Sequence, residues 1–261
     1  GYAFHKNDRP WFVGILLGIA LLSKTTTYPL LAVVVLAALL RWRLEGHSLV
    51  WFSQQMGWLL LPAIAISAPW FARNAVTYGW LDPLSLVRHS EIVSGQPRTS
   101  DWLTMYGWWG LLARLVRTTF QSVWGQFGPM GVLLPVRAYQ MLAAISGVLL
   151  LGFAWWIVDP RRAGLSREQR VSLVLLAVSA MLTLTAFAWY NLSFVQHQGR
   201  YLFPALVPIG LTVALAIDEE SRLLPSAAIP WVVSVMFGLF ALFDVYCLYG
   251  VILPGCINLK P

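Results

Sequence analysis

The sequence predicts an all-α polytopic membrane protein: a transmembrane helix bundle of about seven membrane segments, with one further interfacial helix on the outer face. Three observations predict this fold class. Apolar residues make up 58% of the chain and charged residues only 11%. The charges stand between long apolar stretches rather than inside them. Hydrocarbon offers no water to backbone amides, so each crossing segment must be a helix that satisfies its own hydrogen bonds.

Seven apolar stretches follow one another along the chain, separated mostly by short polar loops. The first two have about 13 residues each, short of the roughly 20 that a perpendicular crossing needs. Two short helices joined at the polar hinge Lys24–Thr27, and tilted spans extended by the threonines, both fit this pattern. The stretches are Trp11–Ser23, Tyr28–Leu40, Leu49–Phe71, Val136–Val158, Val171–Val195, Tyr201–Ile217 and Ile229–Leu253.

The longest polar region, residues 72–129, is predicted to form an outer-face loop that contains an amphipathic helix. Within Trp102–Trp124, apolar side chains recur at helical spacing, while Arg114 and Arg117 interrupt them. This pattern is typical of a helix in the interface plane, and an ordinary helix packed over the mouth of the bundle fits equally. The shared face consists of Trp108, Trp109, Leu112, Leu115, Val116 and Phe120.

Basic residues in the short loops set the predicted orientation. Segments 1–10, 41–48, 159–170 and 218–225 are placed in the cytoplasm, which leaves 72–129, 196–200 and the C-terminus outside. Lysine and arginine beside anionic headgroups then explain the net charge of +7. No basic run interleaves with polar residues, so nucleic acid is not an expected partner. We expect a multi-pass protein of the cell (inner or plasma) membrane that contacts the lipid bilayer.

The chain starts at Gly1 rather than at Met, and its first ten residues do not resemble a signal peptide. We therefore expect residues 1–261 to be a single integral membrane domain, the C-terminal part of a longer chain. The two cysteines, Cys247 and Cys256, fit either a disulfide or two free thiols.

Three local strings contain the side chains best suited to chemistry. Lys24 ends an apolar helix, where it reaches either a phosphate or, by snorkelling, the headgroup region. Arg73 and Asn74 follow the third stretch. Arg73 is suited to clamping a phosphate and Asn74 to orienting a sugar hydroxyl, although a helix end anchored at the headgroups fits equally.

The third string is a turn between two apolar stretches that contains His197, Gln198, Arg200 and Tyr201. It has more hydrogen-bonding side chains than a simple connection needs. Arg200 stands at the start of the following stretch, and a helix N-terminus beside a guanidinium favours anions. The sequence therefore predicts an anion site here.

Together these strings resemble a group of bacterial multi-pass proteins classed with the GT-C glycosyltransferases, relatives of the protein O-mannosyltransferases and aminoarabinose transferases. The resemblance spans residues 11–217. It rests on four strings in order: Gly14–Lys24 (GILLGIALLSK), Pro69–Pro83 (PWFARNAVTYGWLDP), Val123–Gly128 and Gln198–Ile209 (QGRYLFPALVPI).

The resemblance implies transfer of a sugar from a polyprenyl-phosphate carrier at the non-cytoplasmic face, by an inverting mechanism in which an acid takes the acceptor proton. The family's acidic loop has no counterpart here, so the main catalytic acid is expected upstream of Gly1, or lost. Asp82 and Glu91 are the candidate acids within the chain. The implied donor-phosphate ligands are Arg200, Lys24 and Arg73, and the implied substrate-binding residues are Asn74, Gln198, Tyr201 and His197.

Two functions stay open at this point. The first is a GT-C-like membrane glycosyltransferase that uses a polyprenyl-phosphate sugar. The alternative is a non-catalytic GT-C-like scaffold subunit of a larger membrane complex, with other membrane subunits as partners. No cofactor is certain, and whether a divalent metal takes part stays open. A transporter is disfavoured because the apolar stretches contain almost no charged midplane site.

Overall fold

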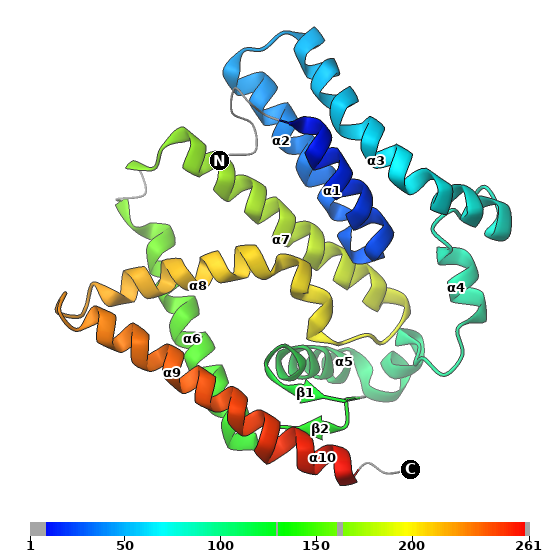
Figure 1. Cartoon of the computed structure of the whole chain (residues 1–261). Helices are drawn as coiled ribbons and strands as arrows, with labels where there is room; N and C mark the ends of the chain where they lie inside the picture. Colours follow the sequence, from blue (N-terminus) through cyan, green and yellow to red (C-terminus); the bar gives the residue numbers. More distant parts are fainter. Residues whose placement is uncertain (1–8, 129, 161–163, 259–261) are drawn as a thin grey trace. The chain divides into compact units, whose positions relative to one another are not determined.

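The computed structural model describes residues 9–128, 130–160 and 164–258 and is nearly all-α (Figure 1). Parts of the predicted cytoplasmic segments 1–10 and 159–170 lie outside these ranges. Within them, six helical segments are long and apolar enough to cross a membrane. They are Thr25–Glu45, Leu49–Tyr78, Val136–Val158, Arg167–Ser193, Gly199–Ser221 and Ile229–Gly255. The helix-bundle fold class is confirmed, and the first predicted stretch forms a shorter apolar helix, Pro10–Ser23.

The chain divides into two compact units, formed by residues 1–98 with 165–195 and by residues 99–164 with 196–261. Unit 1 contains α1 (Pro10–Ser23), the short 3-10 helix η1 (Thr25–Thr27), α2 (Pro29–Glu45), α3 (Leu49–Tyr78), α4 (Leu86–Ile92) and α7 (Arg167–Ser193). Unit 2 contains α5 (Thr99–Trp124), β1 (Gln126–Phe127), β2 (Val132–Leu133), α6 (Val136–Val158), η3 (Gly199–Ala205), α8 (Leu206–Ser221), α9 (Ile229–Tyr246), η4 (Cys247–Ile252) and α10 (Leu253–Asn258).

In unit 1, α1 packs on α3 through two glycines. A Cβ on Gly14 would lie 2.2 Å from the carbonyl oxygen of Leu59, and one on Gly18 would lie 2.9 Å from the Cβ of Ile66. Small residues let helix backbones approach closely, which is how helices in lipid gain van der Waals contact. The two glycines of the first string are therefore packing residues.

The hinge between α1 and α2 shows how the first two apolar stretches are joined. Lys24 is extended, with φ −165° and ψ 146°, and ends α1. The Thr27 hydroxyl donates to the carbonyl oxygens of Ala20 and Lys24, both at 2.6 Å, which satisfies groups that the end of α1 exposes. The threonines form η1 and extend α2 to a membrane-length segment, whereas α1 is a separate short helix.

Helix α3 runs further than predicted, so the predicted end of the third stretch at Phe71 is wrong. The helix continues through Pro62 and Pro69 to Tyr78. It ends at Gly79, whose N–H donates to the carbonyl of Ala75 at 3.0 Å and whose φ of 105° favours glycine. Residues 73 and 74 therefore lie in the last turns of a helix rather than in a loop.

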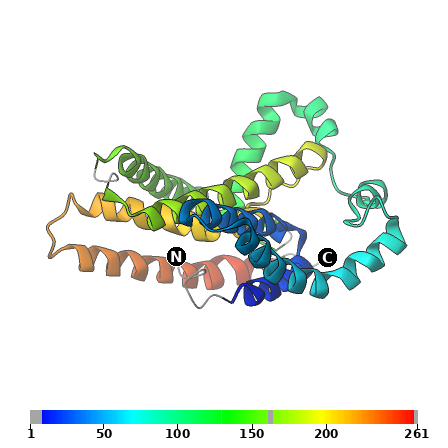
Figure 2. The same cartoon turned by 90° about the horizontal axis from the view of Figure 1, so that it is seen from above.

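The two ends of unit 1 differ in chemistry. At one end, the Arg167 guanidinium donates to the carbonyl of Leu44, so the basic segments around these residues meet. At the other end, Gln96 pairs with the Tyr190 hydroxyl at 3.3 Å, and Arg98 lies 4.2 Å above the ring of the buried Phe194. Figure 2 shows α3 leading from the first end to α4.

In unit 2, the β1–β2 hairpin is fastened to the start of α6 by Tyr139. Its buried hydroxyl donates to the carbonyl of Gly125 at 2.7 Å and accepts the Leu134 N–H at 3.2 Å. The core around it also includes the free, buried thiol of Cys247. The buried cluster is Val132, Leu134, Tyr139, Leu142, Cys247 and Val251.

Helix α5 differs from the single helix predicted over Trp102–Trp124. Gly107 has a φ of 66° and breaks the helical backbone, a conformation that glycine adopts readily. The predicted apolar face lies beyond this break, and its tryptophans are uncovered: Trp108 is 72% and Trp109 is 84% exposed. Leu112 and Val116 are exposed as well, whereas Leu115 and Phe120 are partly buried.

The far ends of α6 and α8 are joined by ion pairs. The Arg222 guanidinium donates to Asp159 at 3.0 Å and to Glu219, and both carboxylates are buried. Arg222 also pairs with the exposed Asp218 at 3.2 Å. Buried carboxylates need such partners, because an unpaired buried charge costs several kcal/mol.

Replacing Gly14 by Ala should separate α1 from α3 and lower the melting temperature of the purified protein in detergent. Because the added methyl would overlap the backbone of Leu59, we expect a loss of about 1–3 kcal/mol, typical of overpacking. Gly57→Ala is the matched control, since nothing lies within 4 Å of a Cβ there. Equal melting temperatures for the two variants would contradict the close approach.

Candidate functional site

A polar pocket of about 320 Å³ lies at the α4 end of unit 1. Its lining combines two carboxylates, two hydroxyls and one guanidinium, and Val87 is its one apolar side chain. The lining residues are Thr77, Tyr78, Asp82, Val87, Arg88 and Glu91. Both candidate acids of the sequence analysis therefore face one pocket.

Asp82 holds the first turn of α4. One carboxylate oxygen accepts the Leu86 N–H at 2.7 Å and the other accepts the Arg88 N–H at 2.9 Å. These backbone donors, the Arg88 N–H foremost, lower the pKa of the Asp82 carboxyl. Since hydrogen bonds to the charged form make a carboxylate a weaker base, Asp82 is suited to positioning rather than to proton abstraction.

Glu91 is the less constrained acid. Its carboxylate accepts a hydrogen bond from the Arg88 guanidinium at 3.2 Å, and both side chains are more than half exposed. Exposed ion pairs contribute at most about 1 kcal/mol, so a ligand can separate this one at little cost. An anion could then take the guanidinium while Glu91 accepts a proton.

Arg73 and Asn74 stand beside this pocket on the last turns of α3. The Arg73 guanidinium donates to the Asn74 side-chain oxygen at 3.1 Å and to the Tyr78 hydroxyl at 3.4 Å, which connects it to a pocket residue. The amide of the buried Asn74 donates to the carbonyl of Pro83 at 3.2 Å. Asn74 thereby fastens the loop that contains Asp82, whereas the Arg73 side chain is exposed.

Lys24 lies elsewhere in unit 1, in the hinge before η1, with an exposed side chain. The ring of Tyr28 packs edge-on against Phe71 with 6.0 Å between centroids, so the hinge reaches the level of α3 just before Arg73. Lys24 does not line the polar pocket.

The turn with the third string is packed against α5 within unit 2. The Thr119 hydroxyl donates to the carbonyl of His197 at 3.1 Å, and the Gly199 N–H donates to the Ser122 hydroxyl at 2.6 Å. The imidazole of His197 is buried against Trp102, and this burial lowers its pKa, so the ring is neutral at pH 7.

The side chains of this turn differ in exposure. The Gln198 side-chain oxygen is buried and, within the described ranges, accepts no hydrogen bond. Arg200 is exposed, with its guanidinium 5.7 Å from the centre of the Tyr201 ring. Of the predicted residues here, Arg200 therefore has the exposed side chain, while the buried His197 packs in the turn.

Three polar residues of the pocket were missed as candidates by the sequence analysis: Thr77, Tyr78 and Arg88. The spacing of Arg88 and Glu91, three residues apart on one helix, could have indicated their pairing. Thr77 and Tyr78 carried no such signal, because they become neighbours of α4 only when the loop folds back. No group of three or more His, Cys, Asp or Glu side chains that could hold a metal occurs in the described ranges.

Acid should loosen the start of α4. The folded pKa of Asp82 is below its ordinary value, so its contribution is complete above about pH 4 and is lost as the pH falls through the lowered value. We expect the exchange protection of the Leu86 and Arg88 amides, corrected for intrinsic rates, to fall in that range.

Asp82→Asn should weaken this protection at neutral pH and flatten its pH dependence. Asp101→Asn, at an exposed acid of α5, is the matched control. Protection that stays constant down to about pH 2 would contradict the capping role.

No protein-family model, curated protein or solved structure matches this chain.

Proposed function

We propose that this protein is a membrane-embedded GT-C-like glycosyltransferase that takes a sugar from a polyprenyl-phosphate carrier at the non-cytoplasmic face. The observation that carries the proposal is the polar pocket of unit 1, at the end of a 30-residue membrane-length helix. A lipid-linked sugar phosphate presents hydroxyls and an anion at that depth. Hydroxyls, carboxylates and a guanidinium are the groups that recognise them.

The roles divide according to how each side chain is held. Glu91 is the acid that takes the acceptor proton, because its carboxylate is held by an exposed ion pair with Arg88 that a ligand can separate. Arg88 and Arg73 hold the phosphate, and Tyr78 and Thr77 contact sugar hydroxyls. Asp82 and Asn74 keep the pocket in shape.

The orientation of unit 1 supports the non-cytoplasmic face. The basic segments around Leu44 and Arg167 meet at one end, and α3 carries the chain from there to the pocket at its other end. Short basic loops are retained in the cytoplasm. By this rule, the pocket opens on the opposite side of the inner or plasma membrane.

One observation favours the alternative, a non-catalytic scaffold subunit that binds other membrane subunits. Both acids of the pocket already have hydrogen-bond partners, and both carboxylate oxygens of Asp82 accept bonds from the backbone of α4. A pocket built only to fold a loop would look the same in this respect. The two functions differ in whether the pocket recognises a lipid-linked phosphate.

Polyprenyl phosphate should bind the detergent-solubilised protein more tightly than the matching polyprenol, which lacks the phosphate. Arg73→Ala should weaken binding about tenfold or more, since one hydrogen bond to a charged group contributes about 1.5–3 kcal/mol. Arg43→Ala is the matched control, an exposed arginine that stacks on Trp42 beside the basic loop. Equal affinity for the phosphate and the alcohol would overturn the proposal in favour of the scaffold.

Glu91→Gln should abolish release of polyprenyl phosphate from a panel of polyprenyl-phosphate-linked sugars in membranes that contain the protein. Loss of a general base lowers a rate by about 10²–10⁴-fold, whereas binding of polyprenyl phosphate should stay within about twofold of wild type. Glu168→Gln, at an exposed acid in the first turn of α7, is the control. Wild-type release by Glu91→Gln would remove Glu91 from the mechanism.

A further inference from the structure

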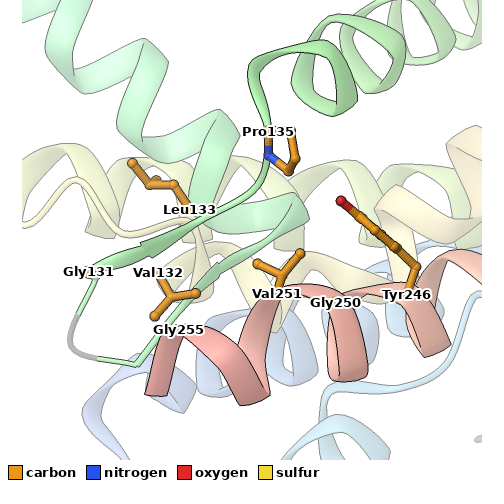
Figure 3. Close-up of a pocket in the computed structure, with 8 residues that line it drawn as sticks. All are labelled: Gly131, Val132, Leu133, Pro135, Tyr246, Gly250, Val251 and Gly255. Carbon is orange, nitrogen blue, oxygen red and sulfur yellow. The ribbon is translucent and has the colours of Figure 1, made fainter. Parts of the chain in front are cut away.

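A second pocket, of about 440 Å³, lies within unit 2 between the β1–β2 hairpin and the last membrane-length segment. In Figure 3, the Val132 and Val251 side chains come from opposite walls and the Tyr246 ring extends toward Pro135. Tyr246 contributes the one polar side chain of the lining. The lining residues are Gly131, Val132, Leu133, Pro135, Tyr246, Gly250, Val251 and Gly255.

The helical wall of this pocket is an irregular helix. Residues Cys247–Ile252 adopt a π-helix. Pro254, just after it, has no N–H, so the carbonyl of Gly250 cannot receive the usual α-helical bond. The Leu253 N–H donates to the carbonyl of Leu248, five residues back. Such wide turns are uncommon and often mark functional sites. Gly255 lets the strand approach, since a Cβ there would lie 2.7 Å from Val132.

Both walls belong to the ends of membrane-length segments. Pro135 stands directly before α6, and the π-helix and α10 end the segment Ile229–Gly255. The pocket therefore lies at the depth where hydrocarbon meets headgroups. Exposed apolar side chains, Val136 at 67% and Leu253 at 45%, flank it, and the half-exposed phenol of Tyr246 is typical of this depth.

Seven of the eight lining residues have an apolar side chain or none, and Tyr246 contributes the hydroxyl of the lining. Such a lining at that depth favours contact with hydrocarbon. Burying apolar surface is favourable by about 25 cal/mol per Å², and acyl chains are the apolar groups that surround these helix ends. The volume is in the range of about 300–1,000 Å³ that is usual for small-molecule sites.

We propose that this pocket is a lipid site that holds one acyl chain of a bilayer phospholipid, with the Tyr246 hydroxyl near the polar ester region. The site is independent of the proposed glycosyltransferase activity. The hairpin and the π-helix flank the chain, so the bound lipid contacts both the segment before α6 and the last membrane segment.

The test uses the whole protein in vesicles of phosphatidylglycerol that contain a trace of the same lipid with a photoactivatable diazirine on one acyl chain. After irradiation, mass spectrometry should find the label enriched on residues 131–135 and 246–255 over the lipid-facing surface of α9. Val251→Phe, which fills the pocket, should reduce this label several-fold. Val245→Phe, the same change at an exposed position of the same helix, should leave it unchanged.

Three outcomes would overturn the proposal. Label spread evenly over the exposed apolar side chains would mean contact with bulk lipid only. Equal labelling of Val251→Phe and Val245→Phe would place the chain elsewhere. Selective labelling of the pocket by a diazirine-bearing polyprenyl phosphate, and not by the phospholipid, would assign it to another lipid. The wild-type map decides the first and third outcomes even if Val251→Phe fails to fold.

Discussion

A backbone amide in hydrocarbon has only its own chain to bond with, and this constraint accounts for most of the architecture. It makes every long apolar stretch a helix, and it makes each helix end or irregularity require a local solution. The Thr27 hydroxyl bonds to carbonyls where α1 stops, Gly79 ends α3, and in the π-helix the Leu253 N–H bonds to the carbonyl of Leu248. The polar pocket lies beside the end of α3, and the second pocket lies beside the π-helix.

Packing between the helices depends on small residues, because lipid tails are as apolar as the side chains that they touch. Gly14 brings the backbones of α1 and α3 together. In unit 2, a Cβ on Gly199 would lie 2.3 Å from Val123, so glycine also allows the turn before η3 to lie on α5. The position of the turn that contains Arg200 therefore depends on its close contact with α5.

At the polar pocket, some side chains hold the backbone in place, and neighbouring side chains are available to contact a ligand. Asp82 and Asn74 form their hydrogen bonds with the backbone of α4 and of the loop. The Glu91 carboxylate and the Arg88 guanidinium pair with each other, in an exposed ion pair that contributes little energy. A ligand that exchanges this pair for its own contacts leaves the loop intact. The same division separates the buried His197 from the exposed Arg200.

The sequence by itself determined the helical class, the positions of the long apolar helices and the basic segments, because hydropathy and loop charge act through composition alone. It also indicated Arg73, Asp82, Glu91 and Arg200 as candidate site residues. Only the tertiary structure decided that α3 continues past residue 72, that α5 breaks at Gly107 and that Asp82 and Glu91 share a pocket. These features depend on contacts that form only when the loop has folded. The spacing of residues along the sequence does not determine those contacts.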